Sequence, residues 1–300
     1  MKLESDTVLY CNLKSIRTSA GSAKKIVLCR NIASFMNDSS YFIVAGLMLF
    51  AIVVIIYIFK YSGTKKIPVP VAFTDELMGE ILEKQVRFYR HLPTDEQQTF
   101  LTRVRYFLEH TKISAEKGAV VTDEDKVLIA ASATIPLFHF KLWVYRNLTE
   151  VLVYPDYFDE RFSTASEQRN VAGMVGSGAL SSKMILSQQA LRNGFLNMSA
   201  GNTAIHEFVH LIDKADGEVD GIPEYLIPKS LIEPWIKEMH KTIREIRSGE
   251  SDIRAYAGTN EAEFFAVVSE YFFKKPALLK EDHPKLYHML DQIYGVSELP

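Results

Sequence analysis

Residues 205–213, Ile-His-Glu-Phe-Val-His-Leu-Ile-Asp, decide the fold of this chain, because they place the pattern His-Glu-x-x-His inside an apolar run. On an α-helix, residues four apart share a face, so His206 and His210 can present imidazole nitrogens to one metal ion. The pattern is typical of zinc hydrolases. Glu207 lies beside the two histidines. There it can take a proton from a metal-activated water and return it to a leaving amine.

The limits of this helix are also readable. Asn202 or Thr203 can cap its start, and Gly217, Gly221 and Pro223 follow soon after its end. The apolar residues between the polar ones predict a buried helix, in which ionisable side chains without partners are costly. A bound metal ion therefore explains this pattern better than hydrogen bonds alone.

A catalytic zinc usually has three protein ligands, so a third ligand is expected away from this helix. The best candidate segment is 256–273, which has helical composition from Asn260 onward. Glu263 and Glu270 are seven residues apart, on one side of that helix and among apolar neighbours. We expect one of them to be a metal ligand and the other to orient a ligand histidine.

Asp213 follows His210 by three residues and shares the metal side of the helix. It can orient a ligand imidazole, or it can be a helix-end carboxylate that organises the loop 213–220. The sequence favours neither role.

Several ordered blocks resemble the Mlc titration factor A family of zinc peptidases, whose active site is related to that of anthrax lethal factor. The blocks are HEFVHLID at 206–213, DGEVDGIP at 216–223 and YAGTNEAEFFAVVSEYFF at 256–273, and the resemblance extends over residues 70–298. It implies peptidase or aminopeptidase activity, with Zn²⁺ as the cofactor. It also implies, from the namesake of the family, binding to a transcriptional regulator of sugar-uptake genes.

Carried over residue by residue, the resemblance implies that His206, His210 and Glu263 are the zinc ligands and that Glu207 is the base. Tyr256, seven residues before Glu263, falls on a tyrosine that assists at the transition state. A phenol at that position can hydrogen-bond the oxyanion of a tetrahedral intermediate. Without the resemblance, Tyr256 would be interpreted as an ordinary packing residue.

Residues 41–59 carry no charge and predict a transmembrane helix. Nineteen residues in a helix span roughly 28 Å, close to the hydrocarbon thickness of a bilayer. Lys60, Lys65 and Lys66 follow this segment, so the positive-inside rule predicts a single-pass membrane protein with a cytoplasmic C-terminal domain. Residues 1–40 form a tail, of which 1–35 are hypothesised to be an over-extension upstream of Met36.

Residues 60–71 are expected to be an extended linker because of Pro68 and Pro70, and residues 72–300 to form one domain. This domain is predicted to be α+β: a mainly helical, zincin-like metallopeptidase domain with a small sheet, preceded by the transmembrane helix. The expected helices cover 74–91, 94–110, 123–138, 202–215, 231–248, 260–273 and 283–294, and the expected strands 150–154 and 184–191.

The net charge of −3 and the isoelectric point near 6.3 give no basic surface, so nucleic-acid binding is not expected. The sequence thus predicts a membrane-anchored zinc peptidase that acts on peptide or protein substrates. The alternative is a non-catalytic binding protein that sequesters a transcriptional regulator at the membrane and uses zinc only for structure. Glu207 favours the peptidase, since a structural zinc site needs no carboxylate beside an open coordination position.

Overall fold

The computed structural model describes residues 38–61, 73–196 and 201–295, and the chain divides into two compact units, residues 1–65 and 66–300. In the first unit the described element is helix α2, Asp38–Tyr61, which confirms a helix over 41–59. Its side chains from 43 to 56 are apolar or glycine and nearly all exposed.

Across the described parts of the chain, no helix reaches the length and apolarity that crossing a membrane requires. The membrane-spanning role of 41–59 is therefore not confirmed. The predicted linker 60–71 starts too early, because α2 continues through Lys60 and Tyr61. Its residues 62–71 and the hypothesis about residues 1–35 lie outside the described residues.

The first four helices of the second unit match the predicted helical segments with two differences. The predicted helix 74–91 is interrupted at Val86, whose backbone is extended, and the predicted helix 123–138 ends at Thr134. Pro136 explains this early end, because it has no backbone N–H to continue the helical hydrogen bonds. The four helices are α3 (Asp75–Gln85), α4 (Arg87–Arg90), α5 (Thr94–His110) and α6 (Asp123–Thr134).

The second unit also contains a four-stranded sheet in the order β1-β2-β4-β3, whose first strand lies between α5 and α6 in the chain. β1 (Lys112–Ala115), β2 (Glu150–Tyr154) and β4 (Lys183–Ser187) are parallel, and β3 (Gly173–Val175) is antiparallel to β4 at one edge. The predicted strand 150–154 is confirmed. The predicted strand 184–191 ends at Ser187, whose hydroxyl accepts a hydrogen bond from the Ala190 N–H and caps helix α7 (Gln188–Gly194).

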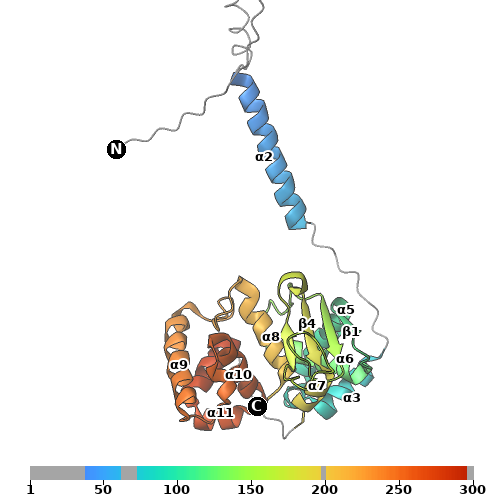
Figure 1. Cartoon of the computed structure of the whole chain (residues 1–300), viewed down its shortest axis with the longest axis vertical. Coiled ribbons are helices and arrows are strands. Elements are labelled where there is room, and N and C mark those ends of the chain that lie inside the picture. The colour runs from blue at the N-terminus through green and yellow to red at the C-terminus, as the bar shows by residue number, and fades with distance from the viewer. Residues whose placement is uncertain (1–37, 62–72, 197–200, 296–300) are drawn as a thin grey trace, which may run out of the picture. The chain divides into compact units, whose positions relative to one another are not determined.

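Helix α8, Thr203–Asp213, lies between the sheet and the C-terminal helices (Figure 1). It contacts β3, β4, α6 and α7, and also α10. The C-terminal helices are α9 (Lys229–Ser248), α10 (Glu261–Lys274), α11 (Pro276–Asp282) and α12 (Pro284–Tyr294). The described residues also include the short 3-10 turns η1 (Gly178–Leu180), η2 (Lys214–Asp216) and η3 (Ala255–Gly258). The described domain is thus mainly helical with a small sheet, as the α+β prediction states.

The core fixes α8 in place. The Asn202 side chain caps the helix by accepting a hydrogen bond from the Ile205 N–H at 3.1 Å. Phe208 is fully buried, with its ring centroid 5.6 Å from that of Phe107 and 5.1 Å from that of Tyr145. Burial of such an aromatic side chain contributes about 1.5–3 kcal/mol. The polar residues of α8 are therefore presented by a helix that the core holds on its other sides.

Candidate metal centre

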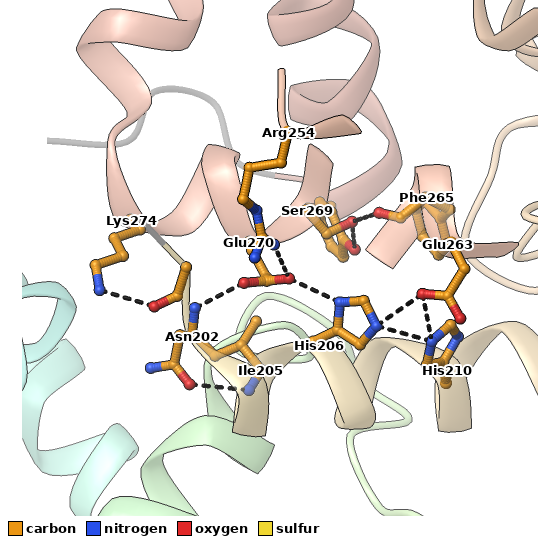
Figure 2. A network of polar contacts seen from close by, with 12 residues as sticks. Asn202, Ile205, His206, His210, Arg254, Glu263, Phe265, Ser269, Glu270 and Lys274 are labelled. Carbon is orange, nitrogen blue, oxygen red and sulfur yellow. Dashed lines mark hydrogen bonds and ion pairs between the residues drawn. The ribbon is translucent and has the colours of Figure 1, made fainter. Parts of the chain in front are cut away.

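Two neighbouring helices bring the three predicted metal ligands together (Figure 2). His206 and His210 lie on α8, and Glu263 lies in the first turn of α10. The Nε2 atoms of the two histidines are 3.0 Å apart, and Glu263 Oε2 is 3.0 Å from His206 Nε2 and 3.5 Å from His210 Nε2. Ligands about 2.0–2.1 Å from a tetrahedral zinc ion are about 3.3 Å from one another. The three atoms are therefore spaced as one face of a zinc tetrahedron.

Glu263 provides a second test of whether a metal ion fits here. Its Oε2 atom is buried and accepts no hydrogen bond from any described residue, although both imidazoles are close. Burial alone would raise the pKa of this carboxyl, but His206 and His210 outweigh burial and hold the pKa well below its usual range. An ionised, buried oxygen without a hydrogen bond is suited to a cation. His206, His210 and Glu263 can thus hold a metal ion.

Glu270 orients the first of these histidines. Its Oε1 accepts hydrogen bonds from His206 Nδ1 at 2.7 Å and from the Arg254 guanidinium at 2.6 Å, and its Oε2 accepts one from the Asn202 backbone N–H at 2.7 Å. These contacts turn the Nε2 of His206 toward Glu263. They favour the orienting role over the ligand role for Glu270.

The electrostatics of the centre favour a cation. Burial favours the neutral imidazole of His206, but its close contacts with the Glu263 and Glu270 carboxylates raise its pKa to about 10. The carboxyl of Glu207 adds to this effect through its charge. A centre that stabilises a proton this strongly also attracts a divalent metal ion in competition with that proton.

Glu207 is buried on α8 beside the ligands, and burial raises its pKa above the ordinary value. The backbone of β3 comes close to this carboxylate at Gly173. A Cβ added there would lie only 2.7 Å from Glu207 Cγ and 2.8 Å from Glu207 Oε1. Gly173 therefore allows the strand to pack directly on this carboxylate. The sequence interpretation missed Gly173, although a glycine within a strand is a signal of close backbone approach.

Tyr256 lies on η3 with 53% of its surface exposed, and its ring centroid is 6.0 Å from that of His206. Such exposure does not fit an ordinary packing tyrosine. Partial burial and the nearby Glu263 carboxylate raise the pKa of Tyr256 to about 12. Its hydroxyl therefore remains a hydrogen-bond donor at neutral pH.

A groove passes the metal centre on both sides. It consists of two hollows of about 400 and 590 Å³ that meet at His206, Glu207 and Tyr256. Gly173 on β3 and Glu160 border both hollows, while His210 and Glu263 border only the larger one. The ligands are thus accessible from this groove.

Asp213 is placed differently from the other predicted residues. Its Oδ2 accepts a hydrogen bond from the Gly221 N–H at 3.0 Å, while its Oδ1 is buried without a hydrogen bond to any described residue. Burial raises the pKa of Asp213 to about 6, although the bond from Gly221 opposes this effect. These contacts favour the role of organising the loop 213–220 over that of orienting a histidine.

Arg254 is a further residue that the sequence interpretation missed. It contacts Glu270 from the start of η3, where no motif or spacing connects it to the metal ligands. Its pairing with a buried carboxylate became evident only in three dimensions.

Comparisons with known proteins agree with this geometry. The model of a family described as glucose-regulated metallo-peptidase M90 matches residues 65–295. The chain is similar to proteins named Mlc titration factor A. The one from Escherichia fergusonii is 30% identical over 222 residues, which cover 69% of this chain and 82% of the relative. The one from Pectobacterium atrosepticum is 30% identical over 220 residues, with 69% and 82% covered.

Proposed function

Because the chain belongs to the glucose-regulated metallo-peptidase M90 family, we propose that it is a zinc-dependent peptidase, with aminopeptidase activity as one form of that reaction. The observation that carries the proposal is the meeting of His206, His210 and Glu263 in a groove, with the buried Glu207 beside them. Zn²⁺ is the proposed cofactor because two imidazoles and one carboxylate are a common donor set of catalytic zinc sites.

A zinc ion held by His206, His210 and Glu263 would polarise both water and the peptide carbonyl. Glu207 would take the proton from the attacking water and pass it to the nitrogen of the leaving amine. Burial raises the pKa of Glu207 above its ordinary value, which makes this carboxylate a stronger base toward the proton of the water.

Tyr256 would stabilise the negative charge that develops on the carbonyl oxygen. Its hydroxyl is protonated at neutral pH, and the residue lines both hollows. A donor aimed at developing charge lowers the barrier more than one that binds the ground state equally well. His206, held by Glu270, keeps the metal site in a fixed orientation toward this donor.

The groove also supports a peptide substrate. β3 is the last strand of the described sheet, and Gly173, Met174 and Val175 border the larger hollow. An extended peptide can pair with the free edge of such a strand through main-chain hydrogen bonds. This pairing recognises the backbone and leaves specificity to the side chains that line the groove.

The test uses the full chain purified in detergent, with metal content and cleavage of a peptide and aminoacyl-amide library measured together. Glu207→Gln should retain the metal and lose cleavage. Glu218→Gln, at an exposed glutamate in the loop after α8, should behave as the wild type. Cleavage that survives Glu207→Gln would refute the assigned role of Glu207.

The second candidate function is sequestration of a transcriptional regulator, and the names of the Mlc titration factor A relatives favour it. In this case the metal would serve only the structure. Metal in both the wild type and Glu207→Gln, without cleavage of any library member by either, would make sequestration the better account.

We also propose that 41–59 anchors the protein in a membrane as a single-pass helix, with the second unit in the cytoplasm. The exposed apolar side chains of α2 and the lysines that follow it in the sequence support this proposal. Carbonate extraction of cell membranes tests the anchor, and protease protection of a C-terminal tag tests the orientation. Release by carbonate would refute the anchor.

A further inference from the structure

A cavity of about 360 Å³ lies apart from the metal centre, where the segment around α4 approaches the end of α10 and the start of α8. It shares none of its lining residues with the two hollows of the groove. The proposed peptidase reaction therefore does not account for it.

The polar lining of this cavity has one sign of charge. Arg87, Arg90, His91, Lys274 and Lys275 line it, and no acidic side chain is among its described lining residues. This composition differs from that of the whole chain, which has slightly more acidic than basic residues. The cavity therefore presents a local positive potential to whatever enters it.

The apolar lining provides a surface for a ring or an alkyl group. Phe88, Phe195 and Phe273 contribute aromatic rings, and Ile135 and Ile205 contribute aliphatic side chains. A cavity with an apolar wall and a few charged groups is the usual form of a small-molecule site.

Lys274 is the half-buried cation of the cavity (Figure 2). Its ammonium donates to the carbonyls of Gly194 at 2.6 Å and Gly201 at 2.9 Å, so two of its three N–H bonds have acceptors among the described residues. It forms no ion pair with a carboxylate of the described residues, and burial lowers its pKa to about 8, although the charge of Glu270 opposes this shift in part. An anion in the cavity would compensate this buried charge.

Arg87 and Lys275 are available to the same ligand. Neither side chain forms a hydrogen bond or an ion pair with the described residues, and Arg87 is exposed. Arg90, by contrast, donates to the backbone carbonyls of Glu83 and Lys84 and so holds the segment around α4 in place. The cavity thus combines unpaired cations with a fixed wall.

We propose that this cavity binds a small phosphate monoester whose phosphate contacts Lys274, Lys275 and Arg87 and whose apolar body packs on the phenylalanines. The two negative charges of a phosphate monoester can be neutralised by these cations, and a guanidinium can bind two phosphate oxygens at once. The site is separate from the peptidase centre, and its binding readout does not depend on hydrolysis.

The test is calorimetric titration of the full chain in detergent with phenyl phosphate, compared with inorganic phosphate and with benzyl alcohol. Phenyl phosphate should bind more tightly than inorganic phosphate, because only it fills the apolar part, and benzyl alcohol should bind more weakly than phenyl phosphate. The double variant Arg87→Gln/Lys275→Gln should weaken phenyl phosphate binding by about tenfold or more.

The matched control is Lys229→Gln/Arg244→Gln, which removes the same charge from exposed positions on α9. It should leave binding unchanged. No binding of phenyl phosphate at millimolar concentration would overturn the proposal, as would equal binding by Arg87→Gln/Lys275→Gln and the wild type. If the control variant weakened phenyl phosphate binding as much as Arg87→Gln/Lys275→Gln does, the proposal would also be overturned. Binding would then depend on the net charge of the protein and not on this cavity.

Discussion

Substitution of Gly173 by alanine tests whether the position of Glu207 matters for chemistry without changing any ionisable group. The new Cβ would lie 2.7 Å from Glu207 Cγ and 2.8 Å from Oε1, whereas ordinary contacts begin at 3.4 Å. One of the two groups must therefore move by at least about 0.7 Å. The Glu207 side chain is buried, and Gly173 is held in the β3–β4 pairing opposite Leu186, so neither can move freely.

The expected magnitude follows from this displacement. A misplacement of about 1 Å at a reacting group can cost about 100-fold in rate, which corresponds to about 2.7 kcal/mol in activation free energy. Overpacking of the buried contact should also lower the free energy of unfolding by about 1–3 kcal/mol. Metal binding should change little, because the nearest contacts of the added methyl group are with Glu207 and not with a ligand.

The assay measures kcat and metal content of Gly173→Ala alongside Gly79→Ala. Gly79 lies within α3, and a Cβ there meets nothing within 4 Å. Alanine at this helical position should be neutral or stabilise by about 0.5–1 kcal/mol, with unchanged kcat. The control thus separates the steric effect on Glu207 from a general effect of replacing glycine.

Two results would refute the reasoning. Wild-type kcat in Gly173→Ala would mean that the rate does not depend on the position of Glu207. Loss of metal in Gly173→Ala would mean that the strand supports the metal ligands instead of the base.

Tyr256→Phe should lower kcat by about 10–1000-fold with unchanged metal content. The melting temperature of the variant should stay close to that of the wild type, because this side chain is half exposed. A large loss of stability would contradict this prediction. Glu270→Gln should weaken zinc binding by about 10–100-fold, because His206 loses a charged partner, and a competition titration with a chelator measures this. Asp213 has a native pKa of about 6 against 3.8 in the unfolded chain, so ionisation destabilises the native state as the pH rises through this range. Asp213→Asn should therefore be as stable as the wild type below about pH 4 and more stable by up to about 3 kcal/mol at pH 7. Urea unfolding of both proteins at the two pH values measures this. An equal difference in unfolding free energy between variant and wild type at both pH values would refute the prediction.

The metal centre was more predictable from the sequence than the sheet was. His206, Glu207 and His210 are adjacent on one helix whose period and Asn202 cap are local properties of the chain. Glu263 was harder, because its distance from His210 depends on how α10 packs against α8. Its expected position followed from composition and from the family resemblance. Packing then distinguished it from Glu270, which binds Nδ1 of His206 while Glu263 faces both Nε2 atoms.

The sheet was only half predicted, for physical reasons. β1 and β3 have four and three residues, too few for an alternating pattern to stand out. The pairing of β1 joins residues distant in sequence, such as Lys112 with Glu150, and no local signal encodes that register. The predicted strand 184–191 extended into α7 because Ala190 and Leu191 are again apolar after the polar residues 187–189, although the Ser187 cap marks the change to a helix.

The two proposed functions differ in what they require of Glu207. A site that binds metal only for stability gains nothing from a carboxyl that burial makes costly to ionise. Burial is the largest cause of this raised pKa; the charges of His206 and His210 oppose it, and those of Glu263 and Glu270 counteract the histidines. Groups that reduce stability yet are held in place by close packing, as Glu207 is against Gly173, are characteristic of sites selected for chemistry. The geometry around Glu207 therefore favours hydrolysis over sequestration.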